Sequence, residues 1–354
     1  MLKEFKQLLW DVTEEEYRKD NAISYSMISR FIKDGYSAIP VIKESINTPS
    51  LTLGSALDCL VTEGLDKYKE RYYVSECNPV NKTEAVIEEI YKHISDAQNL
   101  EDAIIKCEYT GENVLSDIFD SVDFYKGKTA QYKIKVISEK AQYYIDLKEA
   151  NEHSQTIINE QVDKDTIAMY NSMIMNPLVN DIFFGKHEVT EKFFQAKFRC
   201  LIDNVPFRCM FDLLIVKHKD KKIIPVDLKS TSTPPYDFFS SFVKWNYQIQ
   251  VREYTRILKE VLKGTEFEDY NITDYLYVVV NKNFSSPVVY KIPINHLEGN
   301  IEIDGNVMED PIEKGKLLYK ELMRNKDVLM EYPEEINPFK INNLFYNKEI
   351  KTLI

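Results

Sequence analysis

Apolar residues in the C-terminal half of the chain follow the spacing of β-strands. Residues 189–198 alternate between apolar and polar side chains, which is typical of a half-buried strand. Two apolar runs, 208–216 and 223–231, flank the six-residue charged stretch KHKDKK, and this arrangement predicts a hairpin. Residues 274–281 and 287–292 are rich in Val and Tyr and predict two further strands of the same sheet.

Helical spacing dominates the first half of the chain. Apolar residues recur at intervals of three and four from about 83 to 184, and residues 53–62 carry an apolar stripe with the same period. A further helix is expected at 245–262, after the predicted hairpin. We find no internal repeat or clear linker. The pattern predicts one α/β domain over residues 1–354, with a helical insertion at 83–184 and a C-terminal extension at 305–354.

Composition narrows the class of protein. The 354 residues are 44% hydrophobic and 29% charged, which is typical of a globular chain that buries a sizeable core. No G-x-G-x-x-G or P-loop motif occurs, so we expect no nucleotide cofactor. No apolar run is long enough for a membrane span, and the N-terminus is too charged for a secretory signal. Five cysteines without C-x-x-C spacing fit a reducing cytoplasm.

The distribution of charge along the chain indicates what kind of molecule it binds. The whole chain carries −12, but residues 192–260 contain 13 Lys or Arg against 7 Asp or Glu, a local charge of about +6. A basic channel in an acidic molecule suits binding of a polyanion such as DNA. The alternative for the four lysines of the charged stretch 217–222 is a solvated turn, and we favour it for those four.

Candidate chemistry lies at the ends of the two hairpin strands. Asp212 and Asp227 are expected side by side, and two carboxylates at a sheet edge are ligands that Mg²⁺ prefers. Side chains alternate across a strand, so Lys229 shares a face with Asp227, while Leu228 points to the other face. A Lys there can position the attacking water or neutralise charge on a phosphate. Pro225 is expected to mark the start of its strand, because Pro is disfavoured within central strands.

Polar and aromatic residues follow this strand. Tyr247, Gln250 and Tyr254 have helical spacing, so they can line one helix face and contact a phosphate backbone. Ser230 and Thr231 either hydrogen-bond a phosphate or cap the turn, and the sequence does not favour one reading. The aromatic stretch PPYDFFSSFVKW, 234–245, either packs in the core or stacks bases, and we favour packing.

The ordered set of an Asp, then D-x-K, then Q-x-x-x-Y resembles the PD-(D/E)XK nuclease superfamily. Within it, the chain is similar to the RecE-like (exonuclease VIII) exonucleases of phages and prophages and, more distantly, to lambda-type exonucleases. SYSMISRF at 24–31 and PSLTLGSALDCLV at 49–61 support this resemblance, because they are similar to that family's N-terminal pattern. The resemblance implies a restriction-endonuclease-like core, in which a central mixed sheet is flanked by helices. Its parts would be an N-terminal segment at 20–75 and a catalytic core at 188–295.

The resemblance also implies roles for individual residues. Asp212, Asp227 and the Leu228 carbonyl would bind the metal, Lys229 would be the catalytic lysine, and Gln250 and Tyr254 would contact DNA near the scissile phosphate. The family has a His where this chain has Asp58, which is either a substitute carboxylate ligand or a sign of altered activity. An additional acid at the start of the first strand would be Glu191 or Glu188, and the sequence does not decide between them.

The activity implied is a Mg²⁺-dependent exonuclease, with Mn²⁺ able to substitute, that degrades linear double-stranded DNA from its ends in the 5′→3′ direction. The resemblance implies a homo-oligomeric ring, a trimer or tetramer, a single-strand annealing partner, and the cytoplasm of a bacterium or phage-infected host. No Cys follows Cys209, so we expect no iron–sulfur cluster. Two alternatives stay open: an endonuclease or single-strand nuclease of the same fold, and a non-catalytic DNA-binding protein on a decayed nuclease fold.

Overall fold

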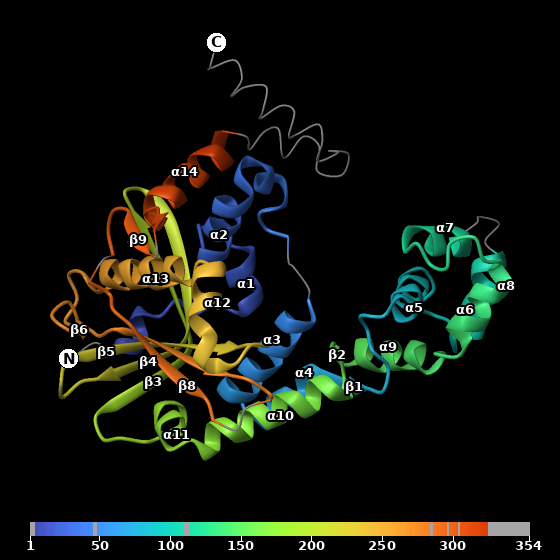
Figure 1. Ribbon diagram of the computed structural model, residues 1–354, viewed down its shortest axis with the longest axis horizontal. Coiled ribbons are helices and arrows are strands. Elements are labelled where there is room, and N and C mark those ends of the chain that lie inside the picture. The colour runs from blue at the N-terminus through green and yellow to red at the C-terminus, as the bar shows by residue number, and fades with distance from the viewer. Residues whose placement is uncertain are drawn as a thin grey trace, which may run out of the picture. The chain divides into compact units, whose positions relative to one another are not determined.

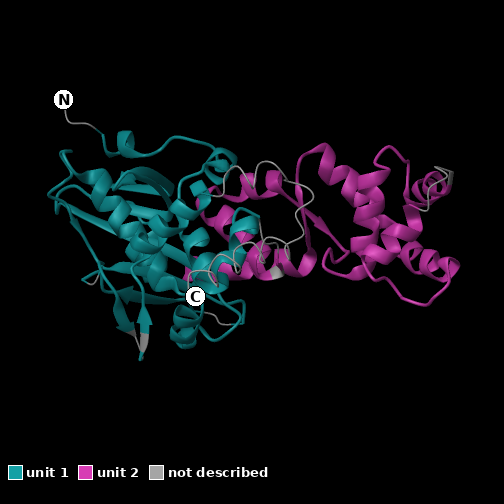
Figure 2. Cartoon of the chain, turned by 90° about the horizontal axis from the view of Figure 1, so that it is seen from above, with its two compact units in different colours: residues 1–46, 176–354 teal, residues 47–175 magenta. Residues whose placement is uncertain are grey.

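The computed structural model describes residues 4–44, 48–109, 114–283, 286–295, 297–303 and 305–324. The chain divides into two compact units: unit 1 comprises residues 1–46 and 176–354, and unit 2 comprises residues 47–175. Figure 1 labels the helices and strands, and Figure 2 colours the two units. Within the described ranges, no helix combines the length and the apolar character that crossing a membrane requires.

Unit 1 is built on a six-stranded mixed sheet (Figure 1). The strand order is β3-β4-β5-β7-β8, and β6 pairs beside β5. β3, β4 and β5 form an antiparallel meander, β7 runs parallel to β5, and β8 is antiparallel to β7. The predicted α/β class with a central mixed sheet flanked by helices is thereby confirmed. The strands are β3 (Thr190–Ile202), β4 (Val205–Lys217), β5 (Lys222–Ser230), β6 (Asn271–Ile272), β7 (Tyr275–Val280) and β8 (Val288–Ile292).

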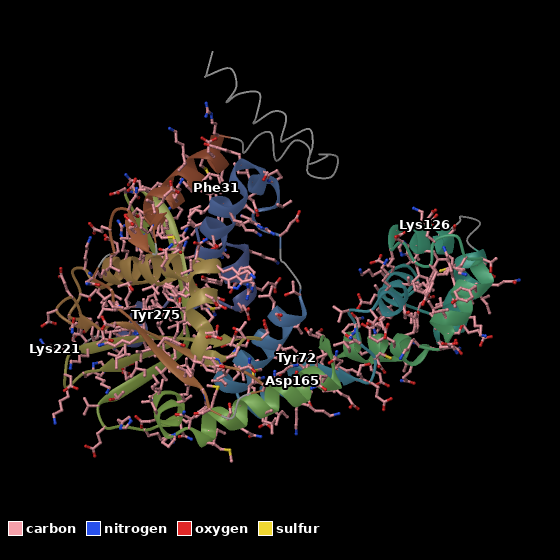
Figure 3. The ribbon with its side chains drawn as sticks, in the orientation of Figure 1. Phe31, Tyr72, Lys126, Asp165, Lys221 and Tyr275 are labelled. Carbon is pink, nitrogen blue, oxygen red and sulfur yellow. The ribbon has the colours of Figure 1, made fainter. Side chains whose placement is uncertain are left out.

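Helices cover this sheet and close its core. α13 (Tyr247–Leu262) packs across β3 and β4, and α2 (Tyr25–Asp34) and α14 (Pro311–Arg324) pack against α13. α13 begins two residues later than predicted, because Asn246 adopts a left-handed conformation with φ of 54°. Tyr275 lies in the interior that results (Figure 3). The remaining elements of unit 1 are η1 (Phe5–Leu8), α1 (Glu14–Lys19), η2 (Gly35–Val41), α11 (Pro177–Phe184), η3 (Pro235–Asp237), α12 (Phe238–Lys244), β9 (Ile301–Ile303) and β10 (Asn306–Met308).

The predicted hairpin is confirmed, with a correction at Pro225. β4 and β5 pair antiparallel, and Lys217 lies opposite Lys222 at the turn, whose Lys221 is labelled in Figure 3. Pro225 is the fourth residue of β5, so the expectation that it starts the strand was wrong. On the side away from β4, β5 pairs with β6 through residue 223 and with β7 from residue 226. Pro225 falls in the gap between these two ladders, where a missing N–H breaks no pairing on that side.

The strands lose their regularity at Asp212. On β4, odd-numbered positions face the α13 core up to Phe211, and even-numbered positions do so from Leu214 onward. On β3, Gln195 occupies the position opposite Asp212 and has a positive φ of 49°. A local shift in the alternation re-aims side chains, as a β-bulge does. The Asp212 carboxylate is therefore released from the core face and can reach toward β5.

Unit 2 is mainly helical, with one small parallel sheet formed by β1 and β2. Residues 47–75 belong to this unit, whereas the sequence grouped 20–75 with the sheet. The reason is a shared core, because Leu60 of α3 and Tyr68 of α4 pack with Ile158 of β2. The elements are α3 (Pro49–Thr62), α4 (Leu65–Arg71), β1 (Tyr72–Ser75), α5 (Lys82–His93), α6 (Leu100–Tyr109), α7 (Val114–Ser121), α8 (Ala130–Ser138), α9 (Gln142–Glu152), β2 (Thr156–Asn159) and α10 (Glu160–Met175).

Candidate active site

Asp227 on β5 is the centre of a buried polar cluster. Its carboxylate is fully buried and is contacted from two sides. The Gln250 side chain on α13 donates from Nε2 to Asp227 Oδ1 at 2.6 Å. Lys229 Nζ lies 2.5 Å from Asp227 Oδ2, as an ion pair that is not aligned as a hydrogen bond. The sheet and α13 thus bring together three residues that the sequence predicted for one site.

Two tyrosines hold the partners of Asp227 in place. The Tyr277 hydroxyl lies 3.2 Å from Gln250 Oε1 and 3.2 Å from the Tyr247 carbonyl, and both are acceptors for its proton. This contact orients the Gln250 amide so that its NH₂ group faces Asp227. Lys229 Nζ lies 5.0 Å from the Tyr247 ring centre and 5.6 Å from that of Tyr277. The rings stabilise the ammonium group through their negative faces.

Asp212 joins the cluster where β4 and β5 separate. The last paired residues are Leu213 and Val226, so Asp212 and Asp227 are next in register. Instead of continuing the ladder, the Leu228 backbone N–H donates to Asp212 Oδ2 at 2.7 Å. The carbonyl of a strand residue points to the same side as its N–H. The Leu228 carbonyl therefore faces the space between the two strands on the Asp212 side.

Burial and charge act in opposite directions on Asp227 and Lys229. Full burial raises the pKa of Asp227, and the Lys229 charge and the Gln250 hydrogen bond oppose that rise. Burial opposes the charge on Lys229, but the carboxylates of Asp227 and Asp212 outweigh burial and raise its pKa above the ordinary value. Lys229 is therefore a protonated cation at neutral pH. The ionised form of Asp227 depends on both Lys229 and Gln250.

The donor set fits a hard divalent cation. Asp227 Oδ2 is buried beside the Lys229 ammonium group, and the Asp212 carboxylate and the Leu228 carbonyl add oxygen donors of the type that Mg²⁺ prefers. Among the described residues, no three His, Cys, Asp or Glu side chains gather closely enough to hold a metal. Two carboxylates and a carbonyl leave room for water and substrate oxygens, which Mg²⁺ usually retains.

The other site residues predicted near this end of β5 differ in how far they are exposed. Tyr247 is partly exposed and lines the lysine, whereas Tyr254 is buried and its ring lies 5.2 Å from that of Phe211. Ser230 ends β5, and the Thr231 N–H continues the β7 ladder by donating to the Val280 carbonyl at 3.0 Å. Direct DNA contact was predicted for Gln250 and Tyr254, but both side chains are buried in the structure.

The two candidates for the additional acid, Glu191 and Glu188, lie outside the cluster, and Asp58 belongs to the other unit. Glu191 on β3 contacts His218 Nε2 at 2.6 Å and pairs in register with Val216, four residues along β4 from Asp212. Four residues of strand correspond to about 13 Å. Glu188 is exposed in the turn before β3. Asp58 lies on α3, in unit 2, and its backbone carbonyl accepts from the Thr62 hydroxyl at 2.8 Å.

Several residues of the site were missed by sequence reasoning. Tyr277 could have been found from the strand 274–281, because Tyr275 and Tyr277 share a face there, and Tyr277 is the register partner of Asp227. Gln195 gave no signal, since its positive φ follows from the pairing of β3 with β4. Asn281 donates to the Thr231 and Thr233 carbonyls at 2.7 Å each and thereby fixes the loop after β5.

A cavity of about 630 Å³ lies elsewhere in unit 1. It is lined by residues of α13, α14 and the β9–β10 region, and no residue of the Asp227 cluster is among them. Arg256 and Asp310 line it, and Arg256 Nη1 donates to both carboxylate oxygens of Asp310, at 2.7 and 2.9 Å. Asp310 also accepts from the Ile312 N–H at the start of α14. These contacts anchor α14, so the polar residues that line the cavity have a structural role.

Comparison with known proteins finds no matching protein-family model and no matching curated protein.

Proposed function

We propose that this protein is a metal-dependent deoxyribonuclease of the PD-(D/E)XK type. The observation that carries the proposal is the convergence of Asp212, Asp227, Lys229 and Gln250 where β4 and β5 separate. The order of elements also supports it, because an antiparallel meander, a helix and a parallel strand follow one another as β3-β4-β5-α13-β7. These elements form a central mixed sheet flanked by helices, which is what the resemblance implies for the core.

Each residue of the cluster has a chemical task in this proposal. Asp212, Asp227 and the Leu228 carbonyl would hold Mg²⁺ or Mn²⁺, which would supply an activated water and charge neutralisation at the scissile phosphate. Lys229 stays protonated and stabilises the charge that develops on that phosphate. Gln250, oriented by Tyr277, keeps the buried Asp227 carboxylate ionised and in place. Tyr247 limits the movement of Lys229 by covering its ammonium group.

The substrate proposed is linear double-stranded DNA, degraded from its ends in the 5′→3′ direction. The resemblance and the local positive charge of residues 192–260 support DNA as the substrate. A homo-oligomeric ring, a trimer or tetramer, that encloses the duplex would explain why a free end is needed. A single strand left by such an enzyme is the substrate of an annealing protein, so we propose one as a partner in the cytoplasm of a bacterium or phage-infected host.

The test is a digest of end-labelled linear duplex beside a covalently closed circle, with Mg²⁺, with Mn²⁺ and with EDTA. The Lys229→Ala protein is the loss-of-function variant. Lys222→Ala is its matched control, because Lys222 is an exposed lysine at the other end of the same strand. We expect the wild type and Lys222→Ala to shorten only linear DNA, and EDTA and Lys229→Ala each to abolish the reaction.

The outcomes separate the alternatives. Cutting of the circle or of single strands would assign an endonuclease or single-strand nuclease of the same fold. Release of label from the 3′ end first would reverse the proposed polarity. If DNA ends are bound but neither metal supports cleavage, the protein is a non-catalytic DNA-binding protein, and Asp58 in place of the family's His becomes the residue to restore by Asp58→His.

A further inference from the structure

Exposed aromatic side chains gather in the segment that follows β5, the strand that carries Asp227 and Lys229. Tyr236, Phe239 and Trp245 are 66%, 57% and 49% exposed. They are the exposed aromatic residues of unit 1 within its described ranges, and all three lie within ten residues of one another. We call these three side chains the aromatic surface. Such a concentration differs from the scattered exposed apolar residues that any protein carries.

The segment that carries the aromatic surface is helical. Tyr236 lies in η3, Phe239 in α12, and Trp245 is the residue that ends α12. Tyr236 and Phe239 are three residues apart and are therefore neighbours on this helical segment. Phe242 lies three residues after Phe239, and its ring stacks on that of Phe239 with centres 6.4 Å apart. Phe242 is buried, so it joins the exposed rings to the core.

The buried side of the same segment forms a wall of the candidate active site. The Phe238 ring stacks on that of Tyr247 at 5.7 Å and lies 5.6 Å from that of Tyr277. Tyr247 and Tyr277 are the rings that flank Lys229 Nζ. One ring therefore separates the exposed face of α12 from the tyrosines around the catalytic lysine. A DNA strand that reaches Lys229 passes close to the exposed face of α12.

Polar groups are interspersed with the aromatic surface. Lys244 Nζ lies 4.8 Å from the Trp245 ring centre, which places a cation beside an exposed ring. Ser232, Thr233 and Ser240 are exposed, and their hydroxyl groups can donate to phosphate oxygens. The Tyr25 hydroxyl donates to the Trp245 carbonyl at 3.0 Å and ties this end of the segment to α2. The rings are thus presented from an anchored element.

We infer that the aromatic surface binds single-stranded DNA by stacking its unpaired bases beside the scissile phosphate. Every base has a π-face, so exposed rings bind single strands without reading their sequence, while neighbouring cations and hydroxyls follow the backbone. The inference deepens the proposed function, because it explains how the separated end of a duplex is held at Lys229. The expectation that the stretch 234–245 packs in the core holds for Phe238 and Phe242, whereas Tyr236, Phe239 and Trp245 are exposed.

The chemistry of the surface favours bases over a second copy of the chain or a membrane. Asp237, Ser240 and Lys244 are exposed between the three rings, so the apolar area is interrupted. A stable protein interface has a continuous buried centre of about 1,000 Å² or more in total. A membrane surface requires a helix with one uninterrupted apolar face. Separate rings with polar groups between them suit the spacing of bases along a strand.

The experiment measures DNA binding in EDTA, where no cleavage occurs. Full-length protein is titrated into a fluorescein-labelled twenty-residue oligothymidylate, an abasic oligomer of equal length and charge, and a blunt duplex. Phe239→Ala and Tyr236→Ala are compared with Tyr132→Ala, a matched exposed tyrosine in unit 2. Truncating one ring is expected to raise the Kd for oligothymidylate about tenfold. Tyr132→Ala is expected to bind like the wild type.

Trp245 provides a second readout that does not depend on a substitution in the surface. The chain has two tryptophans, so Trp10→Phe leaves Trp245 as the only indole. Stacking of a base on this ring is expected to quench its fluorescence with oligothymidylate and not with the abasic oligomer. Lys229→Ala in the same background is expected to retain the quenching, which separates base binding from catalysis.

Three outcomes would overturn the inference. Equal loss of affinity for the abasic oligomer would show an electrostatic contact instead of stacking. A change in the sedimentation of Phe239→Ala, with unchanged DNA affinity, would assign the surface to contact between copies of the chain. Binding of the surface to phosphatidylglycerol vesicles, lost in Phe239→Ala, would assign it to a membrane. Quenching without any nuclease activity would keep the inference and reject the proposed enzyme.

Discussion

Replacement of Glu253 by Gln tests how burial controls charge in unit 1. Glu253 lies on α13 and is fully buried, and neither of its carboxylate oxygens has a hydrogen-bond partner among the described residues. Burial raises the pKa of Glu253 well above the ordinary value, and only the nearby charge of Arg208 opposes this. The described contacts include no ion pair between Glu253 and Arg208. Burial therefore favours the neutral form of Glu253 in the folded protein.

The sign of the pH effect follows from this difference. In the unfolded chain Glu253 ionises above pH about 4.3, whereas in the folded protein it keeps its proton to a higher pH. The folded state thus binds the extra proton, and stability is lost as pH rises above the unfolded pKa. Each pH unit in this window costs about 1.4 kcal/mol of unfolding free energy. Glu253→Gln keeps the shape and removes the titration, so its stability relative to the wild type should rise with pH across this window.

Urea unfolding at several pH values, followed by tryptophan fluorescence, measures this difference. Both tryptophans, Trp10 and Trp245, lie in unit 1, so the signal reports on the unit that contains Glu253. Glu266→Gln is the control, because Glu266 is exposed. A variant that is less stable than the wild type at pH 7 by about 3–5 kcal/mol would refute the reasoning, because it would mean that Glu253 is ionised and paired with Arg208.

Four further perturbations have expected outcomes. Gln250→Leu removes a hydrogen bond to a buried carboxylate, which is worth about 1.5–3 kcal/mol, so the rate of cleavage should fall about tenfold to a hundredfold. Tyr277→Phe should lower the cleavage rate less. Rates measured for both variants on one DNA substrate check these expectations. In Gly315→Ala the new Cβ would lie 2.5 Å from the Phe207 ring, so thermal unfolding should show a loss of about 1–3 kcal/mol. Burial raises the pKa of Cys200 to about 12, so a thiol reagent at pH 8 should label the native protein slowly and all five cysteines after denaturation.

The site could be assembled from the sequence as far as local rules reach. Alternation put Asp227 and Lys229 on one face of a strand, and the ion pair between them confirms it. The charged turn between two apolar runs gave the hairpin, and the pairing of β4 with β5 confirms that too. Helical spacing placed Gln250 on the following helix, and its hydrogen bond to Asp227 brings that helix to the strand.

Contacts between distant segments could not be predicted in the same way. Glu191 was a candidate acid because it starts the first strand, but the register of β3 with β4 places it beside His218. Residues 47–75 were grouped with the sheet, but their apolar faces find partners in β2 and α10. Tyr277 entered the site only because β7 pairs parallel with β5. Each case depends on a pairing that has no local signature in the sequence.

The sequence alone determined the class of fold and the residue types of the site, because periodicity and turn chemistry are local properties that each segment carries with it. Only the tertiary structure decided that Asp212 turns out of the core at an irregularity shared with Gln195. It also decided which aromatic residues of the segment 235–245 are buried and which are exposed. A helix offers several faces to a sheet, and the one that packs is selected by the surface it meets.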